Sequence, residues 1–364
     1  MVNKKIGYIS PIAIHPCEVI KDTLEYLGMS QVDLSLRTGL SEKTISLVLN
    51  GKEPVTPETA LKLERVLDLD QKMLVSIQAR YWADKSRIEE KERLNSEVKF
   101  LKDYSCYNEM AQRGYVEKTT NSLVKVEELL KFFNVNSLGF VPDIMGVSFR
   151  RSVKGKIDDY SLASWLRIGE IEANKREIGS FDKGILKRNV DKMRSLTKES
   201  SDVFLNQLVE LCAEAGVKLV FVPHFKKTKV NGATYWISKE NPLIQLSLFN
   251  KYADIFWFTL FHEIGHILKH GKKESFIELE NGGSSKQNKE EEEANVFAQK
   301  ILIGNDKIYQ DFKKNLNTAN IKTEIIKFAD QIDIEKGIVA GRIGKELEAW
   351  RYVSGLRNKL VFNS

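Results

Sequence analysis

The chain has 364 residues, of which 42% are hydrophobic and 29% charged, as is usual for globular proteins with packed cores. This length allows about two or three domains, and no apolar run approaches a membrane span. The net charge of +6 is mild, and Cys17, Cys106 and Cys212 are too far apart for a disulfide framework. The first residues lead into no signal-peptide core. We therefore expect a cytoplasmic protein with no membrane attachment.

Apolar spacing and capping residues predict four short helices near the start of the chain. The first begins at Pro16 and ends at Gly28. Ser30, Ser41 and Thr56 are N-cap residue types, and they predict three further helices, over 31–38, over 42–50 and from 57 onward. Residues 38–41 form a short turn with a glycine between the second and third helices. This connection is typical of a helix-turn-helix.

This segment resembles the HigA-type antitoxin branch of the XRE/Cro repressor domains, over residues 13–81, on the stretches 15–20, 27–31, 39–46, 49–51 and 54–60. The resemblance implies that the third helix enters the major groove of an operator DNA and that the protein is a homodimer. The residues it implies for DNA contact are Gln31, Ser41, Glu42, Lys43, Thr44 and Ser46. Residues 1–80 carry ten Lys and Arg against ten Asp and Glu, so such contacts depend on local placement of charge. A docking or dimerisation module is the alternative interpretation.

The rest of the chain is predicted to have a mixed composition of helices and strands. Residues 82–149 are expected to be a helical linker region, with a charge-rich helix face at 84–93. Strands are predicted at 217–223, 233–237 and 243–248. The expected fold class is α+β, an all-α helix-turn-helix domain followed by a mostly helical domain at 150–350 with a small β-sheet.

A helix is predicted over the apolar run 253–268, and it contains the pattern H-E-x-x-H at 262–266. His262 and His266 would face the same way, one turn apart. Two imidazoles at this spacing can bind one Zn²⁺, and Glu263 can act as general base toward a metal-bound water. The alternative is a pair of histidines on a half-buried helix.

A catalytic zinc site needs a third protein ligand, which must come from another segment. An acidic run precedes an apolar helical stripe near residue 290. There Glu291 lies one turn from Asn295 on the inward side, so we predict Glu291 as ligand and Asn295 as the residue that orients a histidine. Glu290 is the next choice, and His270 is interpreted as a helix-end residue. The acidic run could also only favour a helix N-terminus.

Residues 256–270, 291–298 and 337–342 resemble the ImmA/IrrE metallopeptidase family, and the resemblance extends over about 150–350. It implies that His262, His266 and Glu291 bind zinc, with Glu291 as a gluzincin-type third ligand and Glu263 as the base. The Leu-Met-Pro usual after the second helix is replaced here by residues 301–304, Ile-Leu-Ile-Gly. No residue that would stabilise the oxyanion formed from the substrate carbonyl is evident, and the candidates we name for this role are Tyr235 and His270.

The combination predicts a DNA-binding transcriptional regulator with a zinc-dependent endopeptidase domain. Members of the ImmA/IrrE family typically cleave a helix-turn-helix repressor. The expected substrate is therefore a repressor or the chain itself, with control of stress, toxin-antitoxin or mobile-element genes, and a toxin is a further expected partner. The alternative is a non-proteolytic antitoxin or repressor of the HigA type whose zincin domain acts as a sensor.

Overall fold

The computed structural model describes residues 11–145, 158–226, 228, 230–247, 252–270, 276–279, 288–304 and 306–360, with only the main chain at 276–279 and 288. The chain divides into two compact units, residues 1–99 and 100–364. The finer division expected from the sequence, at 13–81, 82–149 and 150–350, stays a prediction. Within the described ranges, no helix combines the length and apolar character needed to cross a bilayer.

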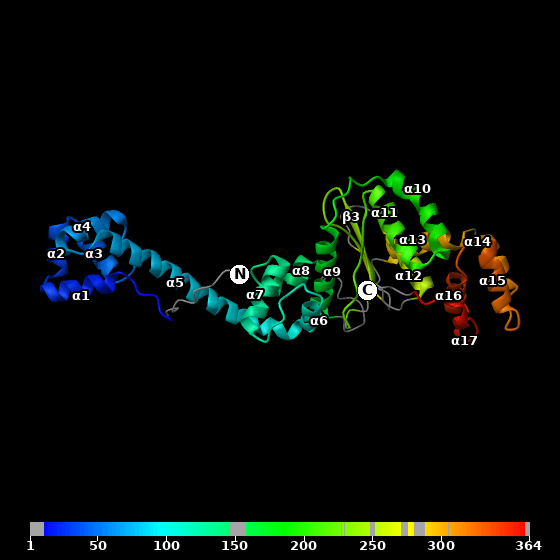
Figure 1. Ribbon diagram of the computed structural model, residues 1–364, viewed down its shortest axis with the longest axis horizontal. Coiled ribbons are helices and arrows are strands. Elements are labelled where there is room, and N and C mark those ends of the chain that lie inside the picture. The colour runs from blue at the N-terminus through cyan, green and yellow to red at the C-terminus, as the bar shows by residue number, and fades with distance from the viewer. Residues whose placement is uncertain are drawn as a thin grey trace. The chain divides into compact units, whose positions relative to one another are not determined.

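The first unit contains five helices within its described residues (Figure 1): α1 (Cys17–Leu27), α2 (Gln31–Thr38), α3 (Glu42–Leu49), α4 (Pro57–Leu67) and α5 (Gln71–Glu97). The first four agree with the predicted helices to within one residue at each predicted end. Ser30 forms a capping box with Asp33, because its hydroxyl accepts from the Asp33 amide at 3.1 Å and the Asp33 carboxylate accepts from the Ser30 amide at 3.2 Å. Gly39 ends α2 with φ +68°, a left-handed conformation that favours glycine.

An apolar core holds these helices together, and its buried members are Ile20, Leu24, Leu34, Ile45, Val48, Leu49, Val55, Ala60, Leu63, Leu67 and Leu74. Ile45 and Leu49 are one turn apart on α3 and both face this core, as predicted. The Ser35 hydroxyl donates to the Leu40 carbonyl at 2.6 Å across the turn between α2 and α3. The turn that sets the angle of α3 is therefore fixed by both packing and hydrogen bonding.

The second unit surrounds a four-stranded sheet in the order β1-β3-β2-β4. The strands are β1 (Lys218–Phe221), β2 (Val230–Trp236), β3 (Pro242–Leu246) and β4 (Phe276–Leu279). β1 is parallel to β3, whereas β2 is antiparallel to both β3 and β4. The first three strands match the predicted ones with shifted ends, and β4 was not predicted. The described residues therefore have the expected α+β class.

The helical elements of this unit are η1 (Val98–Asp103), α6 (Tyr107–Gln112), α7 (Ser122–Phe133), η2 (Leu138–Phe140), α8 (Val141–Ile144), α9 (Asp159–Ala173), α10 (Lys183–Ser195), η4 (Leu196–Lys198), α11 (Ser201–Glu214), α12 (Ala253–Lys269), α13 (Asn288–Ile303), α14 (Asp306–Lys314), α15 (Ile321–Gln331), α16 (Lys336–Glu346), α17 (Trp350–Val353) and η5 (Ser354–Leu356). In Figure 1, α9 and α12 lie on opposite sides of the sheet. Trp257, Phe261 and Ile264 of α12 are completely buried in the main core of this unit.

The two faces of the sheet follow from strand alternation. On one face, the Tyr235 hydroxyl donates to the Leu166 carbonyl of α9 at 2.9 Å. On the other face, the Thr234 hydroxyl donates to the Glu263 carbonyl of α12 at 3.4 Å. Gly232 lies two residues from Thr234 and so shares the face that carries α12. The sheet thus supports α12 at the point where the H-E-x-x-H pattern lies.

Candidate metal and active site

Helix α12 places His262, Glu263 and His266 in the interior of the second unit. The two histidines are each 2% exposed and Glu263 is completely buried. The Nε2 atoms of His262 and His266 are 2.9 Å apart, so both rings direct the same nitrogen to one point. This is the arrangement that one helical turn between two ligands produces.

Helix α13 carries the third candidate ligand to the same point. Glu291 Oε2 is 3.2 Å from His262 Nε2, and Glu291 Oε1 is 3.7 Å from His266 Nε2. The close approach of α13 depends on Gly265, because a Cβ there would lie 3.2 Å from the Ala294 Cα. The predicted set of two histidines and Glu291 is therefore brought together by helix packing.

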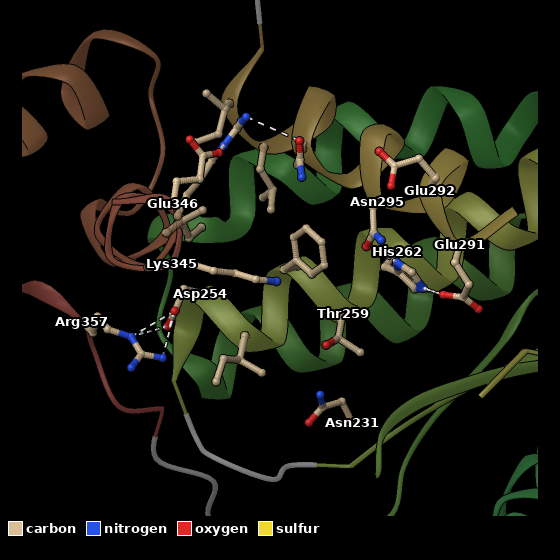
Figure 2. Close-up of a pocket in the computed structure, with 18 of the residues that line it drawn as sticks. Asn231, Asp254, Thr259, His262, Glu291, Glu292, Asn295, Lys345, Glu346 and Arg357 are labelled. Atoms are coloured by element: carbon tan, nitrogen blue, oxygen red, sulfur yellow. Dashed lines mark hydrogen bonds and ion pairs between the residues drawn. The ribbon is translucent and has the colours of Figure 1, made fainter. Parts of the chain in front are cut away.

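Asn295 contacts the back of the His262 ring, with its Oδ1 3.0 Å from His262 Nδ1. An Nδ1–H that donates to this carbonyl oxygen leaves the lone pair of the ring on Nε2, the nitrogen that faces Glu291. Figure 2 shows Asn295 and Glu291 on the two sides of His262. The position of Asn295 is thus the one expected for a residue that orients a ligating histidine.

The surroundings favour the protonation states that metal binding requires. Burial lowers the pKa of His266 to about 4, despite its contact with Glu291. Burial alone would raise the pKa of Glu291, but hydrogen bonds with the two histidines lower it to about 2. His266 is therefore neutral and Glu291 ionised near pH 7, so both can donate an electron pair.

These side chains fit a zinc ion by donor type and spacing. One ligand atom from each of His262, His266 and Glu291 lies within 4.8 Å of the others. Two imidazole nitrogens and one carboxylate oxygen are a donor set used by catalytic zinc, which keeps a fourth position open. Among the described residues, these three side chains form a group of His, Cys, Asp or Glu that could hold a metal ion.

Glu263 lies against β2 as well as within α12. A Cβ at Gly232 would be 2.7 Å from Glu263 Oε1 and 2.7 Å from Thr259 Cγ2, so glycine makes room for the carboxylate at this point of the strand. The Thr234 hydroxyl holds the main chain of Glu263 from the same strand. Two neighbouring elements therefore fix the position of the predicted base.

A cavity of about 710 Å³ extends from His262 and Glu291 along α12, and Figure 2 shows this region. Its walls come from the start of β2, from α12, α13, α16 and α17, and from the segment after η5. They include Asn231, Asp254, Phe258, Thr259, Asn295, Arg342, Lys345, Trp350 and Arg357. At the end far from His262 along α12, Arg357 pairs with Asp254 at 2.9 Å. His262 and Glu291 both belong to this lining, so two of the three candidate metal ligands border the cavity.

The structure argues against Tyr235 and His270 as stabilisers of the oxyanion at the substrate carbonyl. Tyr235 is on the sheet face opposite Thr234, where its hydroxyl also lies 3.2 Å from Gln245 Oε1. Its side chain therefore faces α9 and not α12. His270 Nε2 lies 3.1 Å from the Glu290 carbonyl, so this ring connects the end of α12 to the start of α13.

The residues predicted for DNA contact lie at the start of α2 and along α3. Gln31, Ser41, Glu42 and Lys43 are exposed, whereas Thr44 and Ser46 are half-buried. The Ser41 hydroxyl caps α3 by accepting from the Thr44 amide at 3.0 Å. The Asn50 side chain donates to the Ser46 carbonyl at 2.8 Å. Exposed polar side chains thus cluster at the N-terminus of the helix that the resemblance assigns to the major groove.

Comparisons with known proteins assign a type to each unit. Residues 212–340 match the family described as "IrrE N-terminal-like domain", a peptidase family, and residues 20–70 match a helix-turn-helix family. The chain combines a helix-turn-helix domain with an IrrE-like peptidase-family domain. Among solved structures, an addiction module antidote protein of a HigA family from Coxiella burnetii is similar. It is 23% identical, the match covers 24% of this chain and 95% of that one, and the TM-score is 0.22. A search of curated proteins found no match.

Proposed function

We propose that the chain is a DNA-binding regulator whose second unit is a zinc-dependent endopeptidase. The observation that carries this proposal is the convergence of His262, His266 and Glu291, with ligand atoms within 4.8 Å of one another, beside the buried Glu263. The match of residues 212–340 to an IrrE-like peptidase family supports the reaction class. His262, His266 and Glu291 would hold the zinc ion.

Zinc, when bound, supplies a Lewis acid that polarises the carbonyl group of a peptide bond. Glu263 would accept a proton from the attacking water and pass it to the leaving amine. Its carboxylate lies directly against β2 at Gly232, where a Cβ would come within 2.7 Å of Oε1. Asn295 would keep the His262 ring oriented throughout.

The helix-turn-helix unit would bind an operator DNA through Gln31, Ser41, Glu42, Lys43, Thr44 and Ser46. Support comes from the match of residues 20–70 to a helix-turn-helix family and from the exposed polar side chains at the start of α3. We propose a homodimer in the cytoplasm that cleaves a repressor or a copy of itself, with a toxin as a further partner.

Metal content and cleavage together test this proposal. The protein purified without chelator should contain about one zinc per chain, and His262→Ala should lose it. Glu263→Gln should keep zinc and DNA binding but should not cleave the full-length chain or a repressor encoded next to it. Zinc-loaded wild type that cuts neither protein, nor any peptide of a synthetic library, would refute the endopeptidase assignment.

One observation favours a second candidate, a regulator whose zincin domain senses a metal or ligand without proteolysis. Glu263 and His266 are 0% and 2% exposed, a burial that suits a metal ion or a small ligand better than a large substrate. If this function holds, gene regulation should survive Glu263→Gln and fail in His262→Ala. If proteolysis is the function, both variants should abolish the response.

A further inference from the structure

Strand β2 contains an irregularity next to the candidate active site. Val230 pairs with Leu279 of β4, whereas Gly232 pairs with Glu278, so two steps on β2 oppose one step on β4. Asn231 is the extra residue. A bulge of this kind redirects a side chain that a regular strand would place elsewhere, and bulges are frequent beside active sites.

The bulge directs Asn231 into the cavity that contains His262 and Glu291. Figure 2 shows its carboxamide facing Thr259 below α12, and it lines the cavity wall. The next residue, Gly232, is the one whose Cβ would meet Glu263 Oε1. The main chain is held in place because the Asn231 carbonyl accepts from the Ser247 amide at 2.8 Å. Asn231 is therefore fixed one residue from the contact with the predicted base.

Neither the backbone nor the packing explains why this residue is asparagine. Asparagine is often found in left-handed conformations, but Asn231 is not among the residues with positive φ. Its Oδ1 is buried and has no hydrogen-bond partner among the described residues. Because this oxygen is closed off from the cavity, the amide nitrogen is the polar atom of Asn231 that a ligand in the cavity can reach.

We propose that Asn231 is a positioning residue that holds the main chain of the substrate beside Glu263. A carboxamide nitrogen is a hydrogen-bond donor, which is the group that a peptide carbonyl requires. The Asn231 Nδ2–H, on the side of the carboxamide that faces Thr259, would donate to a substrate carbonyl oxygen. The inference rests on the proposed function, because it assumes a peptide ligand.

Two hydroxamate probes can separate this contact from general support of the metal site. N-acetyl-leucine hydroxamate carries one peptide group, whereas isocaproic hydroxamate has the same carbon skeleton without the acetamido group. Both bind zinc through the same head group. Calorimetry on the zinc-loaded full chain gives the affinity of each probe for wild type, Asn231→Ala and a matched control, Asn206→Ala, on an exposed position of α11.

We expect Asn231→Ala to weaken the peptide hydroxamate about three- to tenfold, as for one hydrogen bond, and to leave the isocaproic probe unchanged. Asn206→Ala should change neither affinity. An equal loss for both probes would show that Asn231 only supports the metal site, and no loss would also overturn the proposal. If Asn231→Ala lowers the melting temperature, Asn231→Ser keeps a small polar group at the bulge and is measured in the same way.

The outcome also separates this inference from the proposed function. If wild type discriminates the probes through Asn231 but cleaves no peptide of a synthetic library, the endopeptidase assignment fails and the peptide-binding role stands. If it cleaves peptides and Asn231→Ala has the same kcat and KM, the positioning role fails and the endopeptidase stands. If neither probe binds the zinc-loaded wild type and no peptide is cleaved, both are overturned.

Discussion

Substitution of Gly232 by alanine tests whether the position of Glu263 matters for function. The added methyl group would lie 2.7 Å from Glu263 Oε1, 2.7 Å from Thr259 Cγ2 and 3.1 Å from Leu246 Cδ2. The two distances of 2.7 Å are too short for real Cβ contacts, so the Glu263 carboxylate and the Thr259 methyl group must move away from β2. Gly232 has no positive φ, and alanine is therefore compatible with its backbone. The strain arises from crowding between β2 and α12.

Two opposing effects determine how much Gly232→Ala changes the free energy of unfolding. Overpacking of a well-packed site costs roughly 1–3 kcal/mol. Replacing glycine by alanine in a strand stabilises the folded state by about 0.5–1 kcal/mol, because alanine loses less backbone entropy on folding. The net loss in free energy of unfolding should be about 1 kcal/mol. Displacement of the base by about 1 Å should lower the rate of peptide cleavage roughly 100-fold. Zinc content should stay constant, because the three atoms nearest to an added Cβ belong to Glu263, Thr259 and Leu246 and not to a candidate ligand.

The assay combines urea denaturation, zinc content and peptide cleavage by the full chain. Gly179→Ala is the matched control, because a Cβ there meets no atom within 4 Å and no positive φ is required. We expect this control to behave as wild type in all three measurements. A folded Gly232→Ala protein with an unchanged cleavage rate would show that the Glu263 carboxylate is not positioned by β2, and the reasoning would be wrong.

Three further predictions concern protonation, metal affinity and DNA binding. In the metal-free chain the pKa of His266 is lowered from 6.5 to about 4 by burial, so the unfolded state binds more protons between these values. The free energy of unfolding should fall by about 3 kcal/mol as pH is lowered from about 6.5 to about 4. A further loss should follow between about 4.5 and about 2, where the unfolded state protonates Glu291 and the folded state does not. A flat profile in urea titrations would contradict this. Asn295→Ala removes the contact with His262 Nδ1 and should weaken zinc binding roughly 10- to 100-fold in a chelator competition, and an unchanged affinity would exclude the orienting role. Lys43→Ala should weaken operator binding and reduce its salt dependence by about one phosphate contact, and an unaltered salt slope would place Lys43 away from the DNA backbone.

The sequence alone predicted the local features of this protein well. Caps at Ser30, Ser41 and Thr56 and glycines at helix ends act over a few residues, so the short helices of the first unit could be placed from their own segments. The pairing of His262 with His266 is local in the same sense, since one helical turn separates them. The candidate ligand Glu291 was also selected from spacing within its own helix.

Only the tertiary structure decided which of these groups meet. The Glu291 carboxylate reaches the two histidines because α13 packs closely on α12 at Gly265, a contact between segments that no local pattern encodes. Strand register decided that Tyr235 faces α9, although its sequence position alone allowed either face. A shift of one residue along a strand reverses the direction of every side chain.

Strand β4 and the bulge at Asn231 show most clearly that local sequence patterns do not determine contacts between distant segments. The residues of β4 follow the H-E-x-x-H helix and pair back onto β2, so the strand is defined by its neighbour rather than by its own four residues. Asn231 becomes a cavity residue only because this pairing is irregular. Hydrogen bonds within a helix join residues four apart and can be predicted from sequence, whereas sheet register and helix packing join distant segments and are determined by the fold as a whole.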